Sequence, residues 1–272
     1  MADDVWAAGE AYEAYVGRWS RLVAAAFVSW LDVPPGQRWL DVGCGTGALT
    51  AAVLAAASPA AVVGVDPSAG FVASARISVP QAGFVVGDAQ ALPFPGRLAD
   101  ATVSGLALNF VPDPGRAAAE FARVTAAGGV VAAYVWDYAG RMAMMRAFWD
   151  AATALDPAAA ALDEGERFPL CRPGHLARLW TAAGLDDVSV RPLDVPTVFT
   201  GFEDYWQPFL GGQGPAPGYA MSLTEQRRLA LRELLRSRLP AGPDGTIALT
   251  ARAWAVRGTA RSIVEATGEK TV

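Results

Sequence analysis

A glycine-rich turn at residues 43–47 constrains the fold of this chain more than any other feature. Three of its five residues are glycine, and it follows the apolar segment 39–42 and precedes the alanine-rich segment 48–57. Glycine lets the backbone turn tightly and lets a ligand approach the main chain. A helix beginning behind the turn offers free N–H groups and the positive end of its dipole. The pattern therefore predicts a buried strand, a ligand-binding turn and a helix.

Two classes of ligand use such a turn, and Asp41 separates them. The spacing Gly43-x-Gly45-x-x-Ala48 satisfies the loose dinucleotide fingerprint. A fixed anion at Asp41 would repel a pyrophosphate. The repulsion between two like unit charges about 4 Å apart costs roughly 4 kcal/mol at an effective dielectric constant of about 20. The same anion would attract S-adenosylmethionine, which carries an ammonium and a sulfonium and no phosphate. The charge argument favours S-adenosylmethionine, and a strand end without chemical meaning is the remaining interpretation.

Residues 40–47, Leu-Asp-Val-Gly-Cys-Gly-Thr-Gly, resemble the first motif of class I S-adenosylmethionine-dependent methyltransferases. Within that family the segment is similar to the ubiquinone/menaquinone-methyltransferase-like group. The resemblance is specific over residues 36–137 and vague beyond them. It implies that the methionine part of the cofactor is held by Asp41, Gly43, Cys44, Gly45, Thr46 and Gly47.

Short apolar runs alternate with helical segments after the break at residues 34–36. Strands are predicted at residues 39–42, 61–65, 83–86, 101–106 and 130–136. Valine-rich runs of this length, alternating with helices, indicate a parallel, doubly wound sheet that is buried on both faces. The resemblance implies an α/β, Rossmann-like fold with seven strands, the last antiparallel, and a helical cap over the C-terminal strand ends. Residues 188–199 and 247–256 can supply the last two strands.

Acidic residues end the second and third predicted strands. Asp66 falls 19 residues after Gly47, an interval at which an acidic side chain meets a ribose. The following Pro67 and Ser68 begin a helix, so a helix cap is the other interpretation of Asp66. Gly87, Asp88 and Ala89 resemble the family segment that meets the adenine. Open parallel sheets bind ligands at these strand ends, which favours a shared site.

The end of the fourth strand resembles the family's fourth motif, whose backbone lies near the transferring methyl. The corresponding residues are Ser104, Gly105 and Leu106. Asn109 stands where many relatives carry histidine, and asparagine cannot titrate, so no general base is predicted there. No catalytic residue is assigned. Contacts with the acceptor are predicted for Asn109, Asp137, Tyr138 and Trp206.

An aromatic stripe marks the helix predicted over residues 9–31. Tyr15, Arg18 and Trp19 resemble an N-terminal helix that closes over the methionine end in some relatives. Aromatic faces also attract a sulfonium through cation–π interaction. An aromatic stripe at this spacing more often reflects ordinary core packing.

The predicted organisation is an N-terminal helical lid (1–35), a cofactor-binding core (36–137), a substrate cap with the last two strands (138–260) and a tail (261–272). In the cap region, helices are predicted at 138–165 and 173–184, a loop at 211–218, and a helix at 222–239. The last of these would begin with Ser222 and Glu225 as a capping box.

Composition excludes several classes of protein. The chain is 53% hydrophobic and 18% charged with a net charge of −5, which favours a large core and argues against nucleic-acid binding. Its two cysteines and one histidine are too few for a structural zinc site, so no metal is predicted. No signal pattern or membrane span is evident, and we expect a cytoplasmic protein without membrane partners. Oligomeric state cannot be inferred from the sequence.

The sequence thus predicts an S-adenosylmethionine-dependent methyltransferase that acts on a small, apolar or aromatic metabolite. A NAD(P)-dependent oxidoreductase on a Rossmann fold is one alternative, although no hydride-transfer residues are evident. A non-catalytic S-adenosylmethionine-binding protein is the other. The sequence does not indicate the acceptor, or whether oxygen, nitrogen or carbon is methylated.

Overall fold

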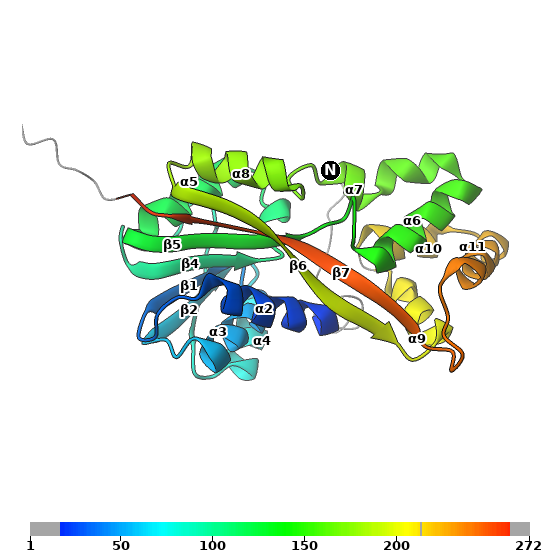
Figure 1. The fold of residues 1–272 in the computed structure, drawn as a ribbon, viewed down its shortest axis with the longest axis horizontal. Coiled ribbons are helices and arrows are strands. Elements are labelled where there is room, and N and C mark those ends of the chain that lie inside the picture. Colours follow the sequence, from blue (N-terminus) through cyan, green and yellow to red (C-terminus); the bar gives the residue numbers. More distant parts are fainter. Residues whose placement is uncertain (1–16, 213, 262–272) are drawn as a thin grey trace, which may run out of the picture.

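A seven-stranded sheet forms the centre of the protein in the computed structural model, which describes residues 17–212 and 214–261. The strand order is β3-β2-β1-β4-β5-β7-β6 (Figure 1). The strands are β1 (Arg38–Val42), β2 (Ala61–Asp66), β3 (Gly83–Val86), β4 (Ala99–Gly105), β5 (Thr125–Trp136), β6 (Asp186–Phe199) and β7 (Ile247–Thr259). Strands β1 to β5 pair in parallel, and β7 lies antiparallel between β5 and β6. The predicted Rossmann-like sheet with an antiparallel last strand is confirmed.

Helices cover the two faces of the sheet, which explains the continuous apolar runs of its inner strands. Figure 1 shows the helices α2, α3 and α4 on one side of the sheet and α5 and α8 on the other. Their bounds are α2 (Arg18–Leu31), α3 (Ala48–Ala56), α4 (Ala69–Ser78), α5 (Pro114–Val124) and α8 (Pro173–Ala182). On α5, for example, Ala117, Phe121 and Val124 are fully buried and fall on one helical face.

The strands β6 and β7 extend beyond the rest of the sheet. Pairing of β7 with β5 stops at Ala253, whereas its pairing with β6 continues to Ile247. The result is a two-stranded ribbon that leaves the sheet and carries a second group of helices, as Figure 1 shows. We call this group the cap; it comprises α6 (Ala143–Leu155), η3 (Pro157–Leu162), α7 (Glu164–Arg167), α9 (Phe202–Trp206), η4 (Gln207–Gly211), α10 (Pro215–Ser222) and α11 (Glu225–Arg238).

Aromatic side chains form the interior of the cap. Phe148 on α6 stacks on Phe209 with ring centroids 4.5 Å apart, and both rings are fully buried. The Tyr205 hydroxyl donates a hydrogen bond to the Met144 carbonyl over 2.9 Å. Rigid rings that stack and satisfy their polar atoms stabilise a small core with few residues.

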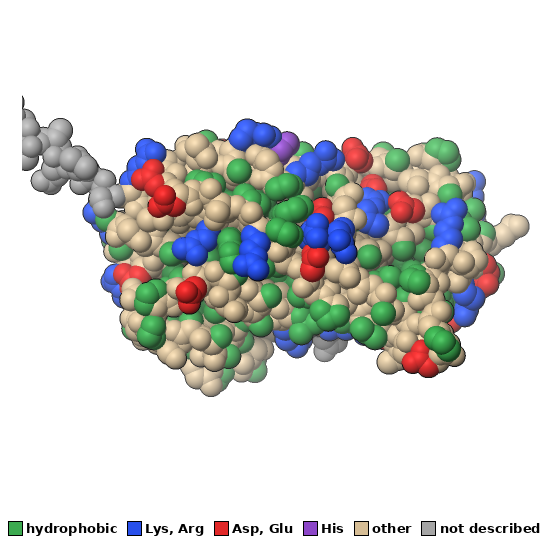
Figure 2. All heavy atoms as spheres, in the orientation of Figure 1, with side chains coloured by type: hydrophobic (Ala, Val, Ile, Leu, Met, Phe, Trp, Pro, Cys, Tyr) green, Lys and Arg blue, Asp and Glu red, His purple; other side chains and the backbone are tan. Residues whose placement is uncertain are grey.

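The surface of β6 and β7 carries mixed charge. Figure 2 shows arginine and acidic side chains interspersed on this face of the molecule. Arg252 on β7 donates two hydrogen bonds to the Asp194 carboxylate on β6, over 2.6 and 2.8 Å. Arg261 similarly contacts Asp186 over 2.8 Å. Such cross-strand pairs help to fix the register of an exposed ribbon.

The prediction of one continuous helix over residues 138–165 is wrong. Residues 137–141 form a turn in which the Gly140 and Met142 N–H groups both donate to the Asp137 carbonyl. Helix α6 ends at Leu155, and Asp156 accepts from the Ala158 N–H at the start of η3. Pro157 cannot continue the hydrogen-bond ladder of α6, so the chain restarts there as a shorter element.

Two further predictions in the cap are wrong. The segment 211–218 is not all loop, because α10 begins at Pro215, with Gly214 before it at a φ of 88°. Proline suits the first turn of a helix, where its missing N–H needs no partner. The cap residue of α11 is Thr224, whose hydroxyl accepts from the Arg227 N–H, while Ser222 instead donates to the Tyr219 carbonyl at the end of α10.

The described part of the N-terminal helix agrees with the prediction from Arg18 onward. Trp19 and Val23 are buried as expected, whereas Leu22 is 44% exposed. Tyr15 and the rest of residues 1–16 lie outside the described residues, so the lid and the domain boundaries stay predictions. None of the described helices is long and apolar enough to cross a membrane.

Candidate functional site

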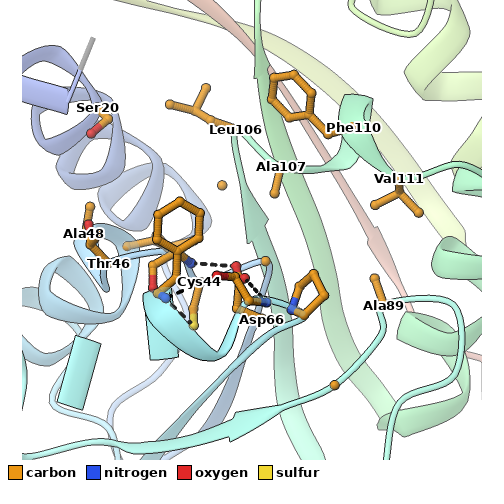
Figure 3. A pocket seen from close by; sticks show the side chains of 18 of the residues that line it. Ser20, Cys44, Thr46, Ala48, Asp66, Ala89, Leu106, Ala107, Phe110 and Val111 are labelled. Atoms are coloured by element: carbon orange, nitrogen blue, oxygen red, sulfur yellow. Dashed lines mark hydrogen bonds between the residues drawn. The ribbon is translucent and has the colours of Figure 1, made fainter. Parts of the chain in front are cut away.

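A cavity of about 500 Å³ opens at the C-terminal ends of β1, β2, β3 and β4 (Figure 3). Its wall contains residues of the glycine turn (Gly43, Cys44, Gly45 and Thr46), the end of β2 (Asp66, Pro67 and Ser68), the loop after β3 (Gly87, Asp88 and Ala89) and the end of β4 (Gly105 and Leu106). The parallel register brings these four segments to one edge of the sheet. Cavities of this size accommodate a cofactor-sized ligand.

The glycine turn is held against β2 by its backbone. The Gly43 and Cys44 N–H groups both donate to the Val65 carbonyl, over 2.7 and 3.0 Å. Gly43 has a φ of 75°, and a Cβ there would lie 2.4 Å from the Ala107 Cβ. Gly45 has a φ of 52°, but a Cβ there would meet no atom within 4 Å. The backbone at Gly45 is therefore open to an approaching ligand.

Asp66 links two segments of the cavity wall. Its Oδ2 accepts from the Gly45 N–H over 3.0 Å and its Oδ1 accepts from the Ser68 N–H over 2.9 Å. Burial raises the pKa of the carboxyl, and the two backbone donors oppose that rise. The helix cap of α4 is Ser68, which accepts from the Phe71 N–H, so the interpretation of Asp66 as the helix cap is wrong. Its carboxylate oxygens retain lone pairs for a ligand.

Asp88 is exposed in the wall at the end of the cavity beyond β3. Its Oδ1 accepts from the Gln90 backbone N–H over 2.8 Å, and the Gln90 side-chain amide also contacts it. These donors lower the pKa of the Asp88 carboxyl. At neutral pH this end of the cavity therefore presents an ionised carboxylate.

Asp41 lies behind the glycine turn and is absent from the cavity wall. It is fully buried, and its Oδ2 accepts from the Thr50 hydroxyl over 2.7 Å. Its Oδ1 has no hydrogen-bond partner among the described residues. Burial raises the pKa of the Asp41 carboxyl to about 7, against the opposing effect of Thr50. The assumption that Asp41 is a fixed anion therefore needs correction, because its charge at neutral pH is partial until a cation approaches.

Two other predicted cofactor residues also stand behind the wall. Gly47 precedes α3 with a φ of 93°, and a Cβ there would lie 2.9 Å from the Val79 side chain, away from the cavity. Ser104 is 1% exposed within β4. Both support the turn rather than line the cavity.

Arg18 and Trp19 contact the end of β6 and the cap instead of the cavity. The Arg18 guanidinium lies 2.9 Å from the Asp204 carboxylate and stacks over the rings of Trp19 and Phe199. The Trp19 ring meets Phe199 edge-on at 5.4 Å. Neither side chain belongs to the described cavity wall. The structure therefore favours the alternative of core packing for Trp19.

The predicted acceptor contacts are not in the wall either. The Asp137 carboxylate accepts from the Arg141 N–H over 2.9 Å and so stabilises its own turn. Tyr138 and Trp206 are buried and pack on Phe168 and Phe209 respectively. Asn109 lies on η2 (Leu108–Phe110), and both polar atoms of its amide are buried without a partner among the described residues. Of these four residues, only Asn109 lies between wall residues in sequence.

Several wall residues were not predicted. They are Ser20, Ala48, Leu49, Phe71, Ala107, Phe110, Val111, Pro112 and Tyr134. Residues 107–112 directly follow the fourth-strand motif, so their position was within reach of sequence reasoning. Ser20 and Tyr134 carry no such signal, because helix placement and strand register bring them to the cavity.

The polar groups of the wall suit a nucleoside with a cationic tail. The open backbone at Gly45 and the Asp66 carboxylate in the wall, with the unpartnered Asp41 oxygen behind the glycine turn, match a ligand with hydroxyls and an ammonium. Burial raises the pKa of the Cys44 thiol, so this wall residue stays protonated at neutral pH. The described wall contains no lysine, arginine or histidine.

Comparison with known proteins selects one family for this site. The family model described as "Methyltransferase domain" matches residues 40–133, which contain the glycine turn and the ends of β1 to β4. This chain contains a class I S-adenosylmethionine-dependent methyltransferase domain. The match supports S-adenosylmethionine as the cofactor, as the resemblance predicted, and disfavours the dinucleotide alternative.

Curated relatives support the same family. A demethylmenaquinone methyltransferase from Renibacterium salmoninarum is 40% identical over 112 residues, which are 41% of this chain and 45% of that protein. The methyltransferase domain is therefore similar to the predicted menaquinone-methyltransferase-like group. The match spans less than half the length of this relative.

Solved structures extend the similarity of fold across most of the chain. The YcgJ protein from Bacillus subtilis has a TM-score of 0.57 at 16% identity, covering 89% of this chain and 99% of that one. A Haemonchus contortus phosphoethanolamine N-methyltransferase, in complex with S-adenosylhomocysteine, also has a TM-score of 0.57 at 16% identity, covering 93% of this chain and 57% of that one. The methyltransferase domain thus lies within a fold that includes β6 and β7.

Proposed function

We propose that the protein transfers a methyl group from S-adenosylmethionine to a small, apolar or aromatic acceptor. The observation that carries this proposal is the convergence of the glycine turn, Asp66 and Asp88 on one cavity. The family match and the quinone methyltransferase relative support the reaction and are consistent with a planar acceptor.

The cavity offers a distinct place for each part of the cofactor. Residues 43–46 would hold the methionine part, with the buried Asp41 carboxyl behind them supporting its ammonium. The Asp66 oxygens would accept from the ribose hydroxyls, in addition to the two backbone donors they already hold. Asp88 would accept from the adenine amino group, and Ala89 would follow the ring.

The acceptor would enter beside the end of β4. Wall residues there are apolar and include Leu106, Ala107 and Phe110. Phe110 is 39% exposed and meets Phe168 edge-on with ring centroids 5.3 Å apart. An exposed ring supported from behind is a suitable surface for an apolar or aromatic molecule.

The cofactor supplies an activated methyl on a good leaving group, so the protein contributes geometry and exclusion of water. The described wall near Phe110 holds no histidine, lysine or carboxylate that could remove a proton. We therefore infer an acceptor whose attacking atom is already nucleophilic at neutral pH, such as an ionised enol, a thiolate or a neutral amine.

Two measurements test this function against the alternatives. Calorimetry should show S-adenosylhomocysteine binding and no comparable binding of NAD; the reverse result would establish a dinucleotide enzyme. Incubation of metabolite extracts with methyl-labelled S-adenosylmethionine should transfer the label to a small molecule. Cofactor binding without transfer to any fraction would instead indicate a non-catalytic binding protein.

A further inference from the structure

The guanidinium of Arg18 has one hydrogen-bonding edge that its contacts leave unpartnered. At the other end of the group, Nη1 donates to the Asp204 carboxylate over 2.9 Å. The Nε and Nη2 atoms are buried and have no hydrogen-bond partner among the described residues. These two nitrogens form one side of the planar group, and their N–H bonds match the two oxygens of a carboxylate. Arg18 therefore offers a two-donor edge while its other end is already held.

The orientation of this guanidinium is fixed from several sides. Its central carbon lies 4.4 Å from the ring centroid of Trp19 and 4.8 Å from that of Phe199. The Asp204 carboxylate is held in turn, because its second oxygen accepts from the Thr200 backbone N–H over 2.9 Å. A donor group that is already oriented loses little freedom when it binds a ligand, which favours binding. The unpartnered edge of Arg18 is therefore preorganised.

Other unpartnered polar atoms lie where α2 packs against β6. The Trp19 indole N–H is buried without a partner among the described residues, and so is the fully buried Thr197 hydroxyl. Thr197 lies two residues before Phe199 on the same buried face of β6. Arg18, Trp19 and Thr197 thus hold four of the eight such atoms in the described part of the chain. Because buried polar groups are normally hydrogen-bonded, this concentration points to a ligand.

The chemistry of these groups selects a carboxylate. A guanidinium and an indole N–H can only donate hydrogen bonds, and a hydroxyl can donate as well. The matching ligand group must therefore accept several hydrogen bonds and carry negative charge. Asp204 already offsets part of the charge of Arg18. The remaining charge favours a carboxylate with one negative charge over a phosphate with two, since the second charge would be repelled by Asp204.

The junction of α2 and β6 adjoins the cofactor cavity without being part of it. Ser20 lines the cavity, whereas Arg18 and Trp19 do not. Positions two residues apart on a helix are only about 5–6 Å from each other. The elements that form the junction, α2, β6 and α9, all lie outside residues 40–133, which the methyltransferase family model matches. A carboxylate bound here therefore belongs to the second substrate and not to the cofactor.

We propose that Arg18 binds a carboxylate of the acceptor through Nε and Nη2. The inference rests on the proposed function and narrows its acceptor to an acid with an apolar or aromatic body. The carboxylate is a binding group and not the attacking atom, because the two N–H donors engage its lone pairs. Another atom of the acceptor takes the methyl group, whose bond to sulfur breaks with the electron pair left on sulfur. The product therefore keeps its negative charge.

The charge of the methylated product tests this assignment. Metabolite extracts are incubated with the protein and methyl-labelled S-adenosylmethionine, and the labelled product is applied to an anion exchanger. It should be retained at pH 7 but not at pH 3, where a carboxyl group is mostly neutral and a phosphate is still charged. Retention at neither pH, or at both, would overturn the proposal. Transfer of label to no fraction would instead refute the proposed function, so the two failures are distinguishable.

Arg18→Gln and the matched control Asp204→Asn separate binding from a structural role. In protein saturated with S-adenosylhomocysteine, titration followed by NMR should show benzoate binding about tenfold tighter than benzamide. Arg18→Gln should abolish this preference and Asp204→Asn should keep it, with melting temperatures reporting whether each variant is folded. No preference in the wild type, or equal losses in the two variants, would overturn the proposal. A tenfold loss of S-adenosylhomocysteine affinity in Arg18→Gln would overturn it too, because the edge would then bind the cofactor.

Discussion

The sheet edge and the cap use polar groups in opposite ways. At the sheet edge, Asp66 and Asp88 satisfy loop N–H groups and still face the cavity. In the cap, the buried Glu164 carboxylate accepts from the Trp149 indole inside a cluster of aromatic rings. The first arrangement leaves carboxylate oxygens facing a cavity, whereas the second places the carboxyl group among buried rings away from that cavity. Polar residues in the cap are therefore expected to govern stability, and those at the sheet edge to govern binding.

The largest effect should come from the cap. Burial raises the pKa of Glu164 to about 7 from an ordinary value of 4.5. Between these pH values the folded protein keeps a proton that the unfolded chain has released, so the free energy of unfolding falls as pH rises and levels off above about 7. Glu164→Gln cannot titrate and should be about 3 kcal/mol more stable than the wild type at pH 8.

Urea unfolding of both proteins at pH 5 and pH 8 measures this difference. The variant should gain relative to the wild type as pH rises, while its affinity for S-adenosylhomocysteine stays unchanged. Parallel pH profiles for the two proteins would show that Glu164 does not titrate in this window.

At the sheet edge, Asp66→Ala should weaken S-adenosylhomocysteine about 100-fold, because two hydrogen bonds to a charged acceptor are lost. Glu203→Ala is the matched control in the cap, since this acid pairs with Arg232 and Arg236 at the surface. Calorimetry should show no change in the control. A loss of less than tenfold in Asp66→Ala would leave Asp66 with only its role in holding the Gly45 and Ser68 segments.

Asp41 shares one feature with each region. It is buried, as Glu164 is in the cap, but it lies next to the glycine turn at the sheet edge. Its pKa of about 7 means that the carboxyl becomes charged as pH rises from 6 to 8. Affinity for S-adenosylhomocysteine should rise over this interval, by at most about tenfold per pH unit, if the charged form supports the ammonium. Asp41→Asn should remove this pH dependence. A wild-type affinity that is flat with pH would disconnect Asp41 from the ligand.

The smallest effect is expected where the two regions meet. Phe110 in the cavity wall packs against Phe168, which precedes α8. Phe168→Leu should leave S-adenosylhomocysteine binding unchanged and raise KM for the acceptor about threefold, because the edge-to-face contact is worth only about 0.5–1.5 kcal/mol. A change in kcat without a change in KM would contradict a role for this ring pair in acceptor binding.

The part of the fold that carries the glycine turn was predictable because its constraints are local. Gly43, Gly45 and Gly47 are required by positive φ angles, and Asp66 and Asp88 end strands at one edge of a parallel sheet. These residues can be recognised in the sequence because strand ends and turns have specific chemical requirements. The sequence also indicated the antiparallel last strand, through the family resemblance.

Tertiary structure alone decided that Ser20 and Tyr134 reach the cavity. Ser20 lies in an apolar helix and Tyr134 in an apolar strand, and only the packing of α2 and the register of β4 with β5 bring them to the wall. The same packing removed Asp137, Tyr138 and Trp206 from it and buried Asp41 deeply enough to make its charge depend on pH. The type of a residue and its spacing in the sequence determine which chemistry its side chain can provide. Its burial, and its contacts with segments far away in the sequence, determine whether that chemistry is available to a ligand.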